Sequence, residues 1–138
     1  AFGQHSGVAD FTKNTYEMPR FPINEKYGEI ERFKTILKTL PFPFKTVQPD
    51  DKYISDKNNP PKVNIQFYDD LNNLKNINCF SNEEDKWRNS KIKFVNDYSL
   101  DINLEGKFVT ERGRINCSLR EKNGFYRWLG IQFVIKEK

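Results

Sequence analysis

The chain has very little of the chemistry on which most catalytic sites depend. Its 138 residues contain one histidine, His5, and two cysteines, Cys79 and Cys117, and its 7 glycines form no phosphate-binding loop. Nucleophilic catalysis requires a base beside the nucleophile, and a zinc site requires closely spaced ligand pairs. The sequence therefore predicts that the protein is not an enzyme and binds no metal ion and no cofactor. A hydrolase that uses the acidic loops around Asp50 and Asp70 remains an alternative.

Long apolar runs are absent as well. No stretch approaches the ~20 apolar residues that a membrane-spanning helix requires, so we expect no transmembrane segment. The hydrophobic fraction is only 36%, but the aromatic fraction is 14%, with 12 phenylalanines. Such aromatic content excludes intrinsic disorder and favours strands over helices. The length fits one domain with a core of its own.

The excess of positive charge is confined to the C-terminal part of the chain. Residues 1–85 carry 11 Lys and Arg against 13 Asp and Glu, and residues 86–138 carry 12 against 6. A basic surface on the later strands suits an acidic partner, nucleic acid or an anionic membrane surface. Solvated strand faces that discourage edge-to-edge pairing explain the same charges, because they form no continuous run.

The strongest pattern lies between Lys107 and Glu137 and predicts a long C-terminal β-hairpin. Apolar residues alternate with polar ones on both sides of Asn123-Gly124, a pair that suits a type I′ turn. The alternation changes phase near Arg112-Gly113, where we expect a bulge or a turn. A second pattern, with apolar residues three and four apart, predicts a helix over residues 25–39.

These patterns predict an α+β fold. We expect residues 1–20 to form an extended or disordered lead and residues 21–138 to form a single domain. In this domain, one N-terminal helix packs on an antiparallel meander of five to seven strands and covers one face of the sheet.

Cys79 and Cys117 stand in similar settings, since each follows an Ile-Asn pair. If their strands pair or face each other, they can form one disulfide. Otherwise they are two buried thiols that pack as small apolar side chains. The two interpretations are nearly balanced, with a slight preference for a disulfide-containing exported protein (periplasmic, envelope or extracellular) over a cytoplasmic one.

By elimination, the function predicted is that of a non-enzymatic protein-interaction or assembly module. Its binding surface would be the open edge of the sheet or the region around residues 126–128. The candidate binding residues are aromatic or basic side chains of the later strands: Trp87, Arg114, Arg120, Tyr126, Arg127 and Trp128. One alternative is a nucleic-acid-binding domain that uses the same basic face. A further alternative is a cup between sheet and helix that holds an apolar ligand. The oligomeric state is left open.

Overall fold

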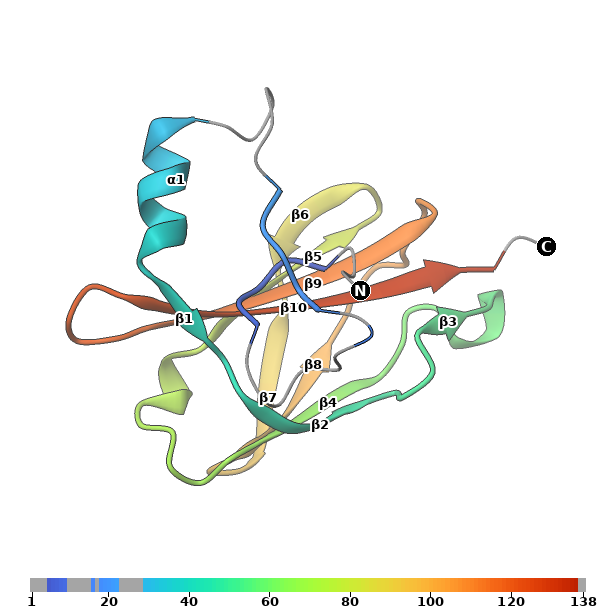
Figure 1. The fold of residues 1–138 in the computed structure, drawn as a ribbon. Helices are drawn as coiled ribbons and strands as arrows, with labels where there is room; N and C mark the ends of the chain where they lie inside the picture. The colour runs from blue at the N-terminus through green and yellow to red at the C-terminus, as the bar shows by residue number, and fades with distance from the viewer. Residues whose placement is uncertain (1–4, 10–15, 17, 23–28, 137–138) are drawn as a thin grey trace.

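The computed structural model shows a β-rich domain with one α-helix and ten strands in the part of the chain that it describes (Figure 1). The described residues are 5–9, 16, 18–22 and 29–136. The elements are α1 (Ile30–Leu37), β1 (Thr39–Pro41), β2 (Phe44–Gln48), β3 (Tyr53–Ile54), β4 (Val63–Phe67), β5 (Asn78–Glu83), β6 (Lys86–Asn89), β7 (Lys91–Asn96), β8 (Ser99–Asn103), β9 (Arg112–Arg120) and β10 (Tyr126–Ile135), with 3₁₀ turns at Asp56–Asn58 and Leu74–Asn76.

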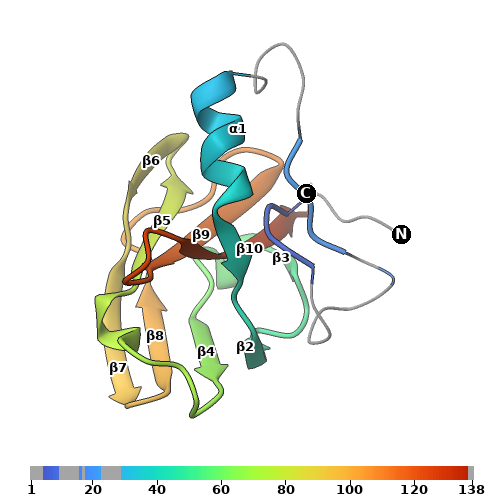
Figure 2. The same ribbon diagram turned by 60° about the vertical axis from the view of Figure 1, so that its left-hand side comes forward.

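The strands form two sheets that face each other across the core (Figures 1 and 2). The six-stranded sheet has the order β1-β10-β9-β5-β6, with β3 also paired to β10, and the four-stranded sheet has the order β2-β4-β8-β7. The chain passes from the first sheet to the second three times, between β1 and β2, between β3 and β4 and between β6 and β7. Most pairs are antiparallel, but β1 and β3 both run parallel to β10.

The core consists of the inward residues of both sheets. In β9 every second residue from Gly113 to Leu119 is buried, and β4 shows the same alternation from Val63 to Phe67. Several Phe and Ile side chains are completely enclosed, among them Phe42, Phe133, Ile54 and Ile65. The alternation that predicted strands therefore marks the residues that exclude water between the sheets.

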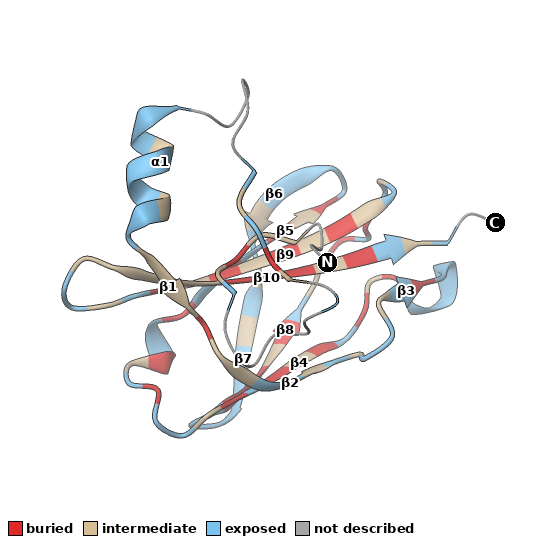
Figure 3. Cartoon of the chain, in the orientation of Figure 1, coloured by how far each residue is buried: buried red, intermediate tan, exposed pale blue. Residues whose placement is uncertain are grey.

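The helix is shorter and more exposed than the sequence suggested. It comprises residues 30–37 rather than 25–39, and residues 23–28 lie outside the described part. None of its residues is buried, and Ile30 and Leu37 are 67% and 64% exposed (Figure 3). The prediction of a single sheet is corrected: the layer opposite β9 and β10 is a second sheet, and its side chains fill the core. This helix is also too short to cross a membrane, as is every other helix in the described ranges.

Strands β9 and β10 pair along their whole length, from Arg120↔Tyr126 to Arg112↔Val134, but not through the predicted turn. Their loop comprises residues 121–125, and only Gly124 in it has a positive φ, of 82°. A type I′ turn needs positive φ at both central residues, so that prediction is wrong for Asn123-Gly124. Instead, the Gly124 N–H donates to the Glu121 carbonyl at 3.2 Å.

A two-residue loop with positive φ at both positions occurs elsewhere, at Glu84-Asp85. Their φ angles are 53° and 60°, and they join β5 to β6 directly after the Glu83↔Lys86 pair. Neither residue is a glycine or an asparagine, the residues that adopt positive φ most readily.

The phase change near Gly113 has a different cause from the one predicted. The pairing of β9 with β10 continues through Arg112 without a bulge. The ring of Phe108, which comes from the preceding loop, takes the place of a side chain at Gly113: a Cβ there would lie 2.3 Å from Phe108 Cδ2. The buried amide of Asn59 holds this loop, because it donates to the Phe108 carbonyl at 2.8 Å and accepts from the Phe108 N–H at 3.0 Å.

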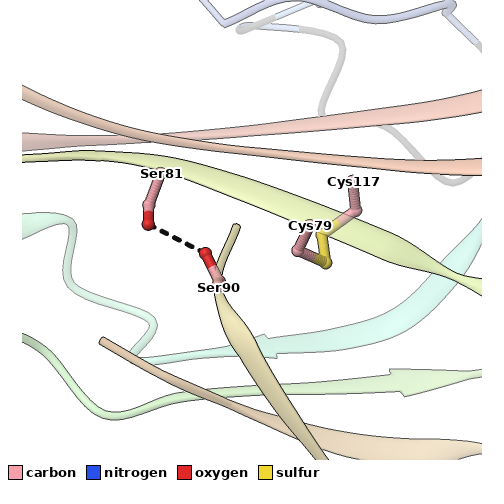
Figure 4. Close-up of a disulfide and its surroundings, with 4 residues drawn as sticks. All are labelled: Cys79, Ser81, Ser90 and Cys117. Carbon is pink, nitrogen blue, oxygen red and sulfur yellow. Dashed lines mark hydrogen bonds between the residues drawn. A yellow bond between two sulfur atoms is a disulfide. The ribbon is translucent and has the colours of Figure 1, made fainter. Parts of the chain in front are cut away.

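Cys79 and Cys117 form a disulfide between β5 and β9 (Figure 4). They are directly opposite in the register, with 4.0 Å between their Cα atoms, and they are 2% and 0% exposed. The similar settings of the two cysteines in the sequence are explained, since both are inward positions of adjacent antiparallel strands. The bond joins strands 38 residues apart in the chain.

A small polar network lies next to the disulfide, where β5 meets β6. The hydroxyls of Ser81 and Ser90 are 2.8 Å apart, and Ser81 also donates to the carboxylate of Glu83 at 2.7 Å (Figure 4). Glu83 is only 1% exposed and accepts from the backbone N–H groups of Glu105 and Gly106 at 3.1 and 2.7 Å. This carboxylate therefore fastens the loop before β9 to the β5–β6 hairpin.

Candidate functional site

The outer face of the six-stranded sheet carries most of the residues that the sequence suggested for binding. The inward residues of β9 and β10 are buried, so the alternate residues point outward. These are Arg112, Arg114, Asn116, Ser118 and Arg120 of β9 and Tyr126, Trp128, Gly130, Gln132 and Val134 of β10. Within this set, Arg120 and Tyr126 are register partners, and the Arg120 guanidinium lies 6.0 Å from the ring centroid of Tyr126.

Two of the candidate residues have structural partners. The Trp128 indole N–H donates to Ser6 Oγ at 2.9 Å, and its ring centroid lies 6.3 Å from that of Phe21. Arg127 points to the opposite side from Trp128; it forms an ion pair with Glu121 at 2.5 Å and donates to the Pro41 carbonyl at 2.8 Å. Trp128 therefore holds the N-terminal segment, and Arg127 ties β1 to the β9–β10 loop.

Residues 5–8 of the predicted lead, to which we restrict the name lead from here on, lie across the outer face (Figures 1 and 2). Gly7 forms an isolated antiparallel bridge with Leu129, and Ser6 donates to Asn116 Oδ1 at 3.1 Å. The backbones come unusually close at Gly130, where a Cβ would lie 2.2 Å from the Ser6 carbonyl oxygen. Glycine in the interior of a strand commonly marks such a close approach. The lead is thus held at one point of β10.

Next to the lead, the edge of β10 is interrupted. On this side β1 pairs with residues 126–128 and β3 pairs with residues 134–135. The N–H groups of Tyr126 and Val134 donate to carbonyls in the segments that contain β1 and β3. Because donor direction alternates along a strand, the backbone polar groups of Gly130 and Gln132 point into the space between. Among the described residues, only the Gly7–Leu129 bridge enters this gap.

The gap opens into a groove between β10 and β2, with a volume of about 390 Å³. Its floor is formed by apolar side chains of both strands, including Phe44, Val47 and Ile131, and β2 has no neighbour on this side in the described part. His5, Lys45, Lys52 and Asp50 also line it. The volume lies in the range of ordinary ligand sites, ~300–1,000 Å³. An open edge therefore borders a pocket with an apolar floor.

Two buried polar atoms in this part of the sheet have no hydrogen-bond partner. They are Nε of Arg114 and Oε1 of Gln132, and the two residues are register partners on β9 and β10. A buried polar group without a partner costs about 1–3 kcal/mol. The outer face thus has one unused donor on β9 and one unused acceptor on the neighbouring position of β10.

A second hollow, of about 560 Å³, lies at the other end of the outer face. It contains Trp87, which is 53% exposed, together with Arg112 and Arg114. The carboxylates of Asp85 and Glu111 line the same hollow. The two positive and two negative side chains of this hollow therefore balance. The candidate residues Trp87 and Arg114 lie here, at the opposite end of the sheet from Arg120 and Tyr126.

The described residues contain no group of three His, Cys, Asp or Glu side chains that could hold a metal ion. Comparison of the chain with models of protein families, with curated protein sequences and with solved structures returned no significant match. The residues that sequence reasoning missed are Gly130 and Gln132. The available signal was the glycine itself, which interrupts a run of large residues in a predicted strand.

Proposed function

We propose that the domain is a non-enzymatic protein-interaction module that binds its partner in the groove between β10 and β2. The observation that carries the proposal is the interrupted edge of β10, where the backbone groups of Gly130 and Gln132 face an apolar-floored groove. Unpaired strand edges are ready templates for pairing with another chain, and proteins normally cover them. An edge that opens into a groove of ligand size supports a binding role.

We further propose that the protein works in an oxidising compartment, as an exported protein. The support is the Cys79–Cys117 disulfide. Disulfides form and persist in secreted, periplasmic and cell-surface proteins and are rare where glutathione and thioredoxin keep thiols reduced. Mass measurement after thiol blocking, with and without reductant, checks the bond in protein isolated from its source cells. Two free thiols in that protein would contradict an exported location.

Site-specific photo-crosslinking tests the interaction role. A photoreactive residue is placed at Lys45, which lines the groove, and in a matched variant at Lys93, on the outer side of the four-stranded sheet. We expect one protein to crosslink at position 45 and not at position 93, and to bind the purified domain with a measurable Kd. Equal crosslinking at both positions, or turnover of a defined substrate by the domain, would overturn the proposal.

Binding of single-stranded nucleic acid is a second candidate. Its support is Trp87, an exposed aromatic ring on which a base can stack, beside Arg112 and Arg114. Such binding would show retention on an oligonucleotide at physiological salt, a steep loss of affinity with added salt and a further loss on Trp87→Ala. Binding only at low salt, unaffected by Trp87→Ala, would exclude this candidate.

A further inference from the structure

We propose that the partner binds as an extended acidic peptide segment, which adds to β10 as a strand between β1 and β3 and displaces the lead. This inference rests on the proposed interaction function and specifies its binding mode. Strand addition draws its affinity from main-chain hydrogen bonds and its selectivity from alternate side chains.

The dimensions of the gap match a short peptide. The flanking pairs end at Trp128 and begin again at Val134, so β10 spans ~20 Å between them at about 3.3 Å per residue. Five residues of β10, 129–133, lie between the flanking pairs, so a segment of about five residues fills the gap. Gly130 lies within it, and Gly7 already forms an antiparallel bridge with the neighbouring Leu129, so a second backbone can pair with β10 there.

The lead is an incomplete occupant of the same edge. Gly7 supplies a single bridge, and with the lead in place Arg114 Nε and Gln132 Oε1 remain buried without partners. One is a donor and the other an acceptor, and a peptide group or a side-chain amide offers the complementary pair. A segment that continues past Gly130 reaches Gln132, whose backbone groups point to this edge, and the additional hydrogen bonds favour exchange. Arg114 lies one strand further away, on β9.

The charges at the groove indicate the character of the segment. Lys45 and Lys52 line it together with one carboxylate, that of Asp50; Lys52 Nζ also donates to the carbonyls of Pro49 and Asp50. Phe44 and Ile131 are among its apolar lining residues. Because side chains alternate along an added strand, the complementary segment places apolar residues toward the floor and acidic residues toward the lysines.

A displayed library of random ten-residue peptides, selected on the full-length protein with its disulfide intact, tests the inference. We expect the selected peptides to carry net negative charge. On their binding to the unaltered protein, hydrogen exchange of the Gln132 amide should slow, and the Trp128 indole resonance should shift as Ser6 leaves. Gly130→Ala places a Cβ 2.2 Å from the Ser6 carbonyl oxygen, so it disfavours the lead, which competes for this edge, and should tighten peptide binding at least ~3-fold. Ser118→Ala, on the same face of β9, should change binding less than ~2-fold.

The amide-exchange measurement is made on the unaltered protein, so it tests strand addition even if Gly130→Ala folds poorly. Selected peptides that protect other amides and leave Gln132 unchanged would overturn strand addition, as would a library that selects no peptide. Neither result affects the proposed interaction function, because that function is tested by crosslinking to an intact partner.

Discussion

Substitution of Glu83 by glutamine tests whether the buried carboxylate stabilises this fold. Glu83 accepts hydrogen bonds from Ser81 Oγ and from the N–H groups of Glu105 and Gly106, and Arg88 Nε lies 3.8 Å from its Oε2. Glutamine has nearly the same shape but no charge, and its amide group replaces one acceptor with a donor. The substitution therefore removes the charge while it leaves the packing almost unchanged.

The magnitude follows from the three hydrogen bonds. Bonds to a charged group contribute about 1.5–3 kcal/mol each, and neutral ones about 0.5–1.5 kcal/mol. Three such changes, partly offset because a neutral side chain costs less to bury, lower the free energy of unfolding by about 2–3 kcal/mol. A domain of this kind has a total of about 5–15 kcal/mol, so the variant still folds and the difference is measurable.

Urea unfolding followed by tryptophan fluorescence measures this difference, and Glu84→Gln is the matched control. Glu84 is the next residue and forms an ion pair with the same Arg88 at 3.1 Å, but its side chain is 61% exposed. Exposed ion pairs contribute little, so we expect a change within about 0.5 kcal/mol. Equal effects of the two substitutions would refute the argument that burial and the backbone donors give Glu83 its importance.

Three further predictions concern the disulfide, the packing of Phe108 against Gly113 near the start of β9, and the pH dependence of the Lys91–Glu105 ion pair. Replacement of both cysteines by alanine should lower the free energy of unfolding by about 4 kcal/mol in the chain-entropy model, because the bond closes a loop of 38 residues; an unchanged urea midpoint would contradict it. Gly113→Ala should cost about 1–3 kcal/mol by overpacking against the ring of Phe108, and a second substitution, Phe108→Leu, should recover part of the loss; failure to recover any would mean that the ring is not the cause. The side-chain hydrogen bond and the attraction between Lys91 and Glu105 lower the pKa of Glu105 and raise that of Lys91. The pair therefore stabilises the fold at neutral pH, and its contribution disappears as pH falls through the lowered pKa of Glu105 or rises through the raised pKa of Lys91. Glu105→Gln should lower the melting temperature slightly at pH 7 and not at pH 2, and an equal shift at both pH values would contradict this ion pair.

The proposed site was only partly accessible to sequence reasoning. Tyr126 and Trp128 were identified because they are aromatic residues beside basic ones in the predicted hairpin, and the structure places both on the outer face of β10. Sequence reasoning could not show that Trp128 holds Ser6, which is 122 residues away in the chain. Arg127 was chosen for its charge, but its contacts with Glu121 and Pro41 arise from the way in which β1 meets the hairpin.

The sequence by itself determined that β9 and β10 form and which of their faces is buried. Alternation with a period of two is a local property, so β9, β10 and the inward positions of both cysteines follow from neighbouring residues. The layer that covers this buried face does not follow from neighbouring residues in the sequence. The pattern of β9 and β10 requires an apolar layer opposite them, and a helix or a second sheet provides such a layer equally well. Only the tertiary structure shows that this layer is a second sheet and that α1 is exposed. The interrupted edge of β10 was likewise decided by tertiary pairing, because it depends on where β1, β3 and the lead, all more than 70 residues away, reach the strand.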